Sequence, residues 1–79
     1  MAKEFKWNGN WAHDCDFPGN DLKYVAIKGE LCGQTCYDTK ECTHFTWSNY
    51  TCWLKKGNVG KEIAVPSKGA VCGVIRSSF

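Results

Sequence analysis

The sequence predicts a small, disulfide-rich α+β domain, and three observations point to this fold class. The chain has 79 residues, and a domain of this size buries only about 60% of the surface of its unfolded chain, so its core alone is marginal. Its six cysteines are an even number, as expected of a disulfide framework. Short alternating apolar and polar runs predict strands, and one stripe with a helical period predicts a short helix. We expect one domain over residues 1–79, with its core at about 7–75.

The N-terminal part of the chain is expected to hold two strands and two turns. Residues 4–7 alternate polar and apolar side chains, as a strand does, and Asn-Gly-Asn at 8–10 marks a turn after them. Residues 17–21 contain Pro, Gly, Asn and Asp, which is a stronger turn signal. Residues 23–27 are mostly apolar and include β-branched side chains, which favours a strand that Gly29 ends.

The period changes to that of a helix from residue 30 to about residue 37. An apolar stripe along this segment includes Leu31, Cys32 and Cys36. Because Cys32 and Cys36 are four residues apart, they stack on one face of a helix. We therefore expect one short helix that carries two cysteines on its buried face.

A hairpin and a final strand are predicted for the rest of the chain. Residues 43–47 and 51–55 are alternating runs joined by Ser-Asn-Tyr at 48–50, which is typical of an antiparallel hairpin. Residues 56–69 are rich in Gly, Lys and Asn, so we expect a surface loop there. The apolar run at 70–75 is then the last strand.

Composition and charge narrow the function classes. The formal net charge is +2, with Lys and Arg scattered along the chain, which is too weak a balance to favour nucleic acid. A disulfide framework points to an oxidising compartment. No run approaches the roughly 18 apolar residues of a membrane span, and residues 1–5 lack the apolar segment of a signal peptide. We therefore expect a secreted, extracellular domain whose native signal sequence has been removed.

Five segments with characteristic spacing follow one another along the chain. They are Trp11…Cys15-Asp16-Phe17…Gly19-Asn20-Asp21-Leu22, Cys32-Gly33-Gln34-Thr35-Cys36, Cys42-Thr43-His44-Phe45-Thr46-Trp47, Cys52-Trp53-Leu54-Lys55 and Val71-Cys72-Gly73-Val74-Ile75. Together they closely resemble the PAN/apple superfamily. The resemblance covers nearly the whole chain, from about Trp7 to Ile75.

The resemblance to PAN/apple domains implies a curved antiparallel sheet that cradles one helix. It also implies two bridges from the helix to the central strands and a third that joins the termini. Carried over by position, these bridges pair Cys15 with Cys72, Cys32 with Cys52, and Cys36 with Cys42. The residues alone leave many pairings open. The chain-entropy model assigns roughly 4, 3 and 2 kcal/mol to the three loops in that order, so the outer bridge should stabilise most.

Zinc binding and cysteine catalysis are rival explanations for the cysteines. Cys32, Cys36, Cys42, His44 and Cys52 lie close together in sequence. Zinc is not favoured, because there is no Cys-x2-Cys knuckle and two further cysteines would be left over. Six paired cysteines also leave no thiol to act as a nucleophile. We expect no metal and no cofactor.

Other groups capable of acid or base chemistry surround the turn at 17–21. They are His13, Asp14, Asp16 and Asp21. Clustered carboxylates can coordinate calcium or act as a catalytic pair, but beside a Pro-Gly turn they more commonly bond their own backbone. His44 has no recognisable nucleophile partner, and we interpret it as a packed or half-exposed sheet residue. No catalytic residue is predicted, so we expect a binding domain and not an enzyme.

Trp53 is the leading ligand-binding candidate. With Phe45 and Trp47 it can form an aromatic surface, which is core under the helix or a platform for a sugar or protein on the open face. If Cys52 bonds to the helix, alternation turns Trp53 to the opposite face of the sheet. The alternative is that Trp53 packs beneath the loop at 56–69.

Basic side chains late in the sequence form a second ligand-binding candidate. They are Lys55, Lys56, Lys61, Lys68 and Arg76. They can gather into a weak patch for an anionic glycan, although a solvated loop explains them as well. Asn49 begins an Asn-Tyr-Thr glycosylation sequon at the predicted hairpin tip.

Taken with the resemblance, these residues predict an extracellular, lectin-like recognition module that binds carbohydrate, including sulfated glycans. One alternative is a protein-protein interaction module of a secreted or cell-surface protein. Another is a small structural or defence protein. Locally, the preference for a glycan rests on Trp53 and on the late lysines.

Overall fold

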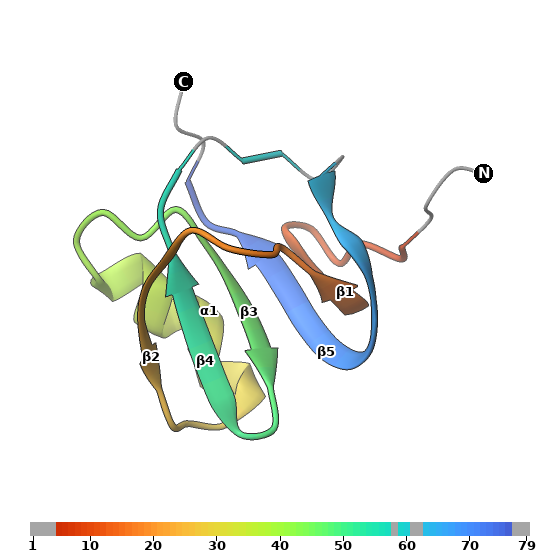
Figure 1. Cartoon of the computed structure of the whole chain (residues 1–79), viewed down its shortest axis with the longest axis horizontal. Helices are drawn as coiled ribbons and strands as arrows, with labels where there is room; N and C mark the ends of the chain where they lie inside the picture. The colour runs from red at the N-terminus through yellow and green to blue at the C-terminus, as the bar shows by residue number, and fades with distance from the viewer. Residues whose placement is uncertain (1–4, 58, 61–62, 77–79) are drawn as a thin grey trace.

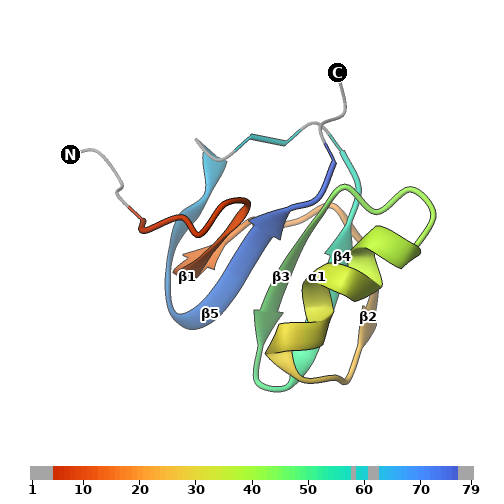
Figure 2. The same ribbon diagram turned by 180° about the vertical axis from the view of Figure 1, so that it is seen from behind.

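A five-stranded antiparallel sheet with a helix against one face forms the body of the molecule (Figures 1 and 2). The computed structural model describes residues 5–57, 59–60 and 63–76. The strand order in the sheet is β1-β5-β3-β4-β2. The elements are β1 (Trp11–Asp16), β2 (Asp21–Val25), α1 (Gly29–Asp38), β3 (His44–Ser48), β4 (Thr51–Lys55) and β5 (Val65–Val74).

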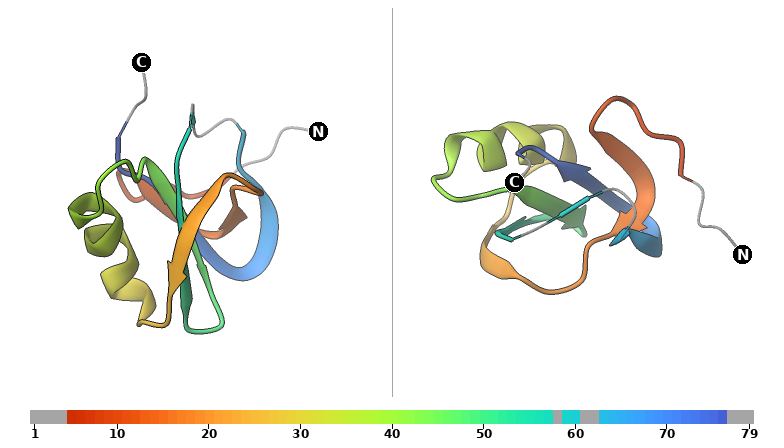
Figure 3. Two further views of the ribbon diagram at one scale, coloured as in Figure 1. Left: turned by 60° about the vertical axis from the view of Figure 1, so that its left-hand side comes forward. Right: turned by 90° about the horizontal axis from the view of Figure 1, so that it is seen from above.

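The helix and four of the five predicted strands are confirmed, most of them with shifted ends. Helix α1 extends the expected segment by a residue at each end, and Cys32 and Cys36 are both buried on it. Strand β5 begins at Val65, inside the segment 56–69 that we predicted as a loop. Figure 3 shows β5 curving strongly as it passes along the sheet. The prediction of a curved antiparallel sheet with one helix is thus confirmed at the level of an α+β fold.

The N-terminal strand is the element that the sequence pattern misplaced. Residues 5–7 are not in a strand, and residue 4 lies outside the described residues, whereas β1 at 11–16 was not predicted. The reason is a β-bulge between His13 and Cys15, where Asp14 has a φ of 61°. The extra residue puts Ala12 and Cys15, three positions apart, in the same buried core. The period of two that reveals a strand is therefore lost.

Two buried cores lie on opposite faces of the sheet, and each contains disulfides. The core under α1 consists of Cys32, Cys36, Cys42, Phe45, Cys52 and Leu54. The other consists of Ala12, Cys15, Phe17, Val59, Ala64 and Cys72. Since neither face alone buries many large side chains, cross-links carry much of the stability of so small a domain.

The six cysteines are paired as the resemblance implied. The bridges are Cys15–Cys72, Cys32–Cys52 and Cys36–Cys42, and none of the six is free. The first joins β1 to β5 and the second joins α1 to β4. The third differs in detail from the expectation, because Cys42 lies in the connection before β3 and not in a central strand. This bridge joins the last turn of α1 to the connection that follows the helix.

Removing the bridges one at a time should rank their contributions by loop length. We expect the double variant Cys15→Ala with Cys72→Ala to lose about 4 kcal/mol of unfolding free energy and Cys36→Ala with Cys42→Ala about 2 kcal/mol, because the first closes a much longer loop. Urea unfolding of both variants beside the unchanged chain measures this. Equal losses would show that loop entropy does not set the order.

The β3–β4 hairpin turns through two residues in the left-handed region of φ. These are Asn49 (φ 50°) and Tyr50 (φ 58°), while Ser48, which we expected in the turn, pairs with Thr51 at the strand ends. This geometry is that of a type I′ turn, which favours Asn followed by Gly. A tyrosine at position 50 therefore strains the backbone and lowers the stability of the folded state.

Replacing Tyr50 by Gly should stabilise the domain by about 1 kcal/mol, since glycine adopts a positive φ without a steric penalty. Thermal unfolding measures the gain. The matched control is Tyr50→Ala, which also removes the exposed ring but keeps the β-carbon. A similar gain in both variants would assign the effect to the ring and not to the backbone.

Candidate functional site

A cleft of about 360 Å³ opens on the face of the sheet opposite α1. It lies over the middle of β3 and β4, between the turn that precedes β2 and the curved part of β5. Its lining residues are Asp16, Pro18, Gly19, Asp21, Thr46, Ser48, Trp53, Lys55, Ser67 and Ala70. The lining thus combines carboxylates and hydroxyl groups with a single large aromatic ring.

Trp53 lies on the helix-free face, as strand alternation predicted. Cys52 and Leu54 are buried in the core beneath α1, so the residue between them points the other way. The Trp53 indole is half-buried and its ring lies 5.0 Å from that of Tyr24, its cross-strand partner on β2. This contact holds the indole at the wall of the cleft.

The continuous aromatic surface that we expected from three residues does not form. Phe45 and Trp47 pack against the core under α1, whereas Trp53 is directly paired with Thr46 on the other face. Successive side chains of a strand point to opposite faces. Trp53 and Tyr24 instead make up a smaller aromatic pair of their own.

Lys55, a predicted ligand-binding residue, lines the cleft but is held by partners within the protein. It is only 4% exposed, and its ammonium group donates to the carbonyl oxygen of Gly19 at 2.9 Å. The same group forms an ion pair with the Asp21 carboxylate at 2.5 Å. A buried ammonium requires such partners, because an unpaired charge is costly in a low-dielectric interior. Lys55 therefore attaches the turn at 17–21 to β4 and shapes the cleft.

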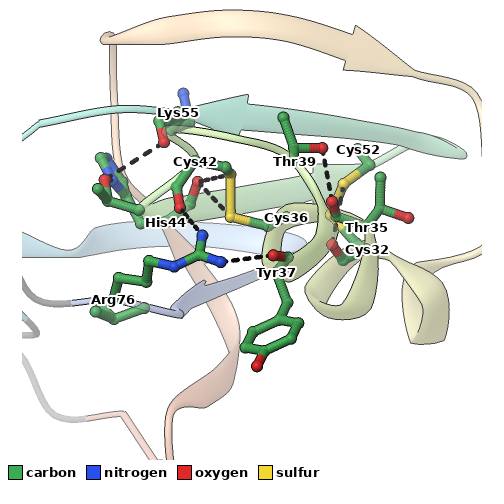
Figure 4. The surroundings of a disulfide bond; sticks show 12 residues. Cys32, Thr35, Cys36, Tyr37, Thr39, Cys42, His44, Cys52, Lys55 and Arg76 are labelled. Carbon is green, nitrogen blue, oxygen red and sulfur yellow. Dashed lines mark hydrogen bonds between the residues drawn. A yellow bond between two sulfur atoms is a disulfide. The ribbon is translucent and has the colours of Figure 1, made fainter.

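Two other predicted basic residues make contacts within the protein. The ammonium of Lys56 lies 3.3 Å from a carboxylate oxygen of Glu41. The Arg76 guanidinium donates to the carbonyl oxygens of Cys42 (2.8 Å) and Tyr37 (2.6 Å), and it lies 5.2 Å from the centre of the Tyr37 ring (Figure 4). Arg76 thus links the segment after β5 to the end of α1 and the connection that follows it.

The predicted basic patch is also divided between two ends of the sheet. Lys56 and Arg76 lie just beyond the positions of β4 and β5 that pair with His44, at the start of β3. Lys68 lies just before Val71, which pairs with Trp47 near the other end of β3. Lys68 is exposed. Lys61 lies outside the described residues. The expectation of one anionic-glycan patch is therefore not supported by these positions.

His44 is a packed sheet residue, as we interpreted it from the sequence. It is 1% exposed, and its ring meets the Phe17 ring edge to face at 5.2 Å. Its Nδ1 lies 2.7 Å from the Thr43 hydroxyl, while its Nε2 is buried without a hydrogen-bond partner. Burial, and then the positive charge of Lys55, lower the pKa of His44 from 6.5 to about 4, against a raising effect of Asp21.

The aspartates around the turn at 17–21 have separate structural roles. Asp14 accepts a hydrogen bond from the Gly69 amide at 2.9 Å and so joins the bulge of β1 to β5. Asp21 pairs with Lys55, and Asp16 lines the cleft. His13 is exposed on the helix side of the sheet. Within residues 5–57, 59–60 and 63–76, no three His, Cys, Asp or Glu side chains are grouped to hold a metal ion.

Sequence reasoning missed the contribution of β5 to the cleft. Ser67 and Ala70 line it, but they fall in or next to the segment that we predicted as a surface loop. The run Val65-Pro66-Ser67 could have indicated the start of this strand, but Pro66 and Gly69 are residues typical of loops and obscured it. Asn49 is exposed at the hairpin tip, where a glycan attached to it would meet solvent.

Comparisons with known proteins leave the family assignment as a prediction. No family model matches the chain, and no curated protein is significantly similar to it. Its three disulfides are compatible with an extracellular protein. None of the helical residues that the structure describes forms a segment long and apolar enough to cross a membrane.

The buried imidazole predicts an acid-sensitive stability. Because the folded-state pKa of His44 is about 4 and its ordinary value 6.5, folding holds the neutral ring, so its stabilisation is complete above pH 6.5 and declines as pH falls to 4. The loss should reach about 3 kcal/mol. Unfolding free energies of the native chain and of His44→Leu over this range measure it. If both decline in parallel, His44 is not the cause.

Proposed function

We propose that the chain is an extracellular binding module that recognises carbohydrate in the Trp53 cleft and catalyses no reaction. The observation that carries the proposal is the half-buried Trp53 indole at the wall of a cleft otherwise lined by polar groups. The resemblance to PAN/apple domains supports a recognition role, and the disulfide framework supports an oxidising, extracellular setting. The chemistry of the cleft supports the choice of ligand class.

A sugar ring matches the two kinds of surface that the cleft offers. Its C–H face packs on an aromatic ring, and its hydroxyl groups need directional hydrogen-bond partners. Asp16 offers carboxylate acceptors, and Ser48 and Ser67 offer hydroxyl groups. A volume of about 360 Å³ is at the lower end of small-molecule sites, which suits one or two sugar rings.

Neutral sugars fit this cleft better than sulfated ones. Among the residues that the structure describes, the cleft lining has two carboxylates, Asp16 and Asp21, and one lysine, Lys55, whose charge is already paired with Asp21. A sulfate group would meet uncompensated negative charge at Asp16. The positions of Lys56, Lys68 and Arg76 do not offset this, because they do not line the cleft.

Binding to a panel of neutral oligosaccharides tests the proposal. Ligands found on a glycan array should be measured by titration calorimetry, and Trp53→Ala should weaken binding by about tenfold or more, because it removes the stacking surface. Affinity should change little between low and physiological salt, since no charged group of the ligand is involved.

The matched control is Tyr50→Ala, which removes another exposed aromatic ring from the hairpin tip, away from the cleft lining. It should bind as the unchanged chain does. Salt-sensitive retention on heparin that survives Trp53→Ala would instead indicate an anionic glycan bound elsewhere. No saccharide binding at millimolar concentration would refute the carbohydrate proposal.

A protein partner is the second candidate, and one observation favours it. Strand β2 is an edge of the sheet, and Leu22 and Tyr24 on it are 40% and 66% exposed. Exposed apolar side chains on an unpaired edge suit the addition of a strand from a partner. Leu22→Lys should abolish such a contact and leave saccharide binding at the Trp53 cleft unchanged.

A further inference from the structure

A second cleft, of about 450 Å³, lies on the opposite face of the sheet between α1 and β1. Its lining residues are Trp11, His13, Gly29, Glu30, Gly33, Phe45, Trp47 and Val71. Figure 2, which views this face, shows α1 on one side and β1 with β5 on the other. We call this cleft the helix-side groove. It shares no lining residue with the Trp53 cleft.

The strand register explains why this groove is rich in aromatic groups. Across β1, β5 and β3, Trp11 is paired with Gly73 and Gly73 with Phe45. In the next row on the same face, His13 is paired with Val71 and Val71 with Trp47. In each row a residue without a ring, Gly73 or Val71 on β5, separates a ring on β1 from a ring on β3.

The rings in and beside the groove pack close to the backbone because glycines stand against them. A β-carbon on Gly73 would lie 2.6 Å from the Phe45 ring, so a larger residue at this position would have to displace that ring. Gly29 and Gly33 lie one helical turn apart on the side of α1 that faces the rings, and a β-carbon on Gly29 would lie 3.1 Å from Trp47. Helix α1 packs on β3 and β4, which leaves the β5 and β1 side of this face open.

The position of the Trp47 ring is set by the protein itself. Its indole N–H donates to the carbonyl oxygen of Ile27 at 2.7 Å, so the ring is held in the groove before any ligand arrives. Trp11 is held at the other wall, where its ring meets that of His13 edge to face at 5.0 Å. Two indoles on opposite walls form a preorganised aromatic site.

The charge of the lining selects among ligands. Of the lining residues in the described part of the chain, Glu30 alone carries a carboxylate, and none is Lys or Arg. Indole rings attract cations through their negative faces, and a nearby carboxylate adds to this attraction. An anionic ligand would be repelled by Glu30, and a highly polar neutral one would find few hydrogen-bonding groups.

We propose that the helix-side groove binds a small organic ammonium cation, with the cationic group near Glu30 and an apolar body between Trp11 and Trp47. The volume is that of a small-molecule site. This function is separate from carbohydrate recognition in the Trp53 cleft, since the two sites lie on opposite faces of the sheet.

Benzyltrimethylammonium is a suitable probe, with benzyl alcohol and benzoate as its neutral and anionic counterparts. NMR titration of the ¹⁵N-labelled chain at pH 7.5 follows the indole N–H signals. We expect the cation to shift the signals of Trp11 and Trp47 but not that of Trp53, and to bind at least about tenfold more tightly than benzyl alcohol. Benzoate should not bind.

Variants distinguish specific binding of the cation from nonspecific binding of apolar molecules. Glu30→Gln should weaken binding of the cation about threefold, as expected for a partly exposed charge pair, and leave binding of benzyl alcohol unchanged. Trp11→Ala should weaken binding of the cation about tenfold. Glu41→Gln, which neutralises an exposed carboxylate outside the lining, should have no effect.

Three results would overturn the proposal. They are equal affinity for benzyl alcohol and the cation, an unchanged affinity in Glu30→Gln, and the absence of shifts at Trp11 and Trp47 at millimolar probe. Glu30 is exposed on α1, so its substitution leaves the fold intact and the test valid even if Trp11→Ala does not fold. Saccharide binding in the same samples is scored independently by the Trp53 signal.

Discussion

The Cys32–Cys52 bridge decides which way the side chains of the central sheet face. Once Cys52 is bonded to α1, Leu54 must also face the helix, and Trp53 and Lys55 must face away from it. The register of β3 and β5 then assigns Phe45 and Trp47 to the helix side. Slipping the register by one residue would exchange the two faces and destroy both clefts.

On the face of the sheet opposite α1, the turn before β2 is held by a buried, paired lysine. Lys55 joins β4 to the turn before β2 through Gly19 and Asp21. Burial of the His44 ring lowers its pKa, and the charge of Lys55 adds to this effect, so the ring is neutral in the folded state near neutral pH. Lys55 therefore shapes the wall of the Trp53 cleft and also contributes to acid sensitivity, against the opposing effect of Asp21.

The direction of Trp53 followed from strand alternation together with the Cys32–Cys52 pairing that the resemblance implied. Residue pattern alone located α1 and the β3–β4 hairpin, because each follows from a local period. It did not locate β1, whose alternation is broken by the bulge at Asp14, nor the start of β5, where Pro66 and Gly69 resemble loop residues. The helix-side groove was missed for a different reason. Its walls come from segments distant in sequence, and the close packing of its rings depends on glycines that carry no chemical signal.

The sequence by itself determined the class of the molecule: a short chain, an even set of cysteines and a helix with two of them on one face. These features depend on composition and local periodicity, which need no knowledge of long-range contacts. Only the tertiary structure decided which charges are free. From the sequence, Lys55 was predicted as one of several basic residues able to bind an anionic glycan. In the structure its charge is paired with Asp21, which lies on another strand. Ligand chemistry depends on such pairings, and they exist only once the strands are in register.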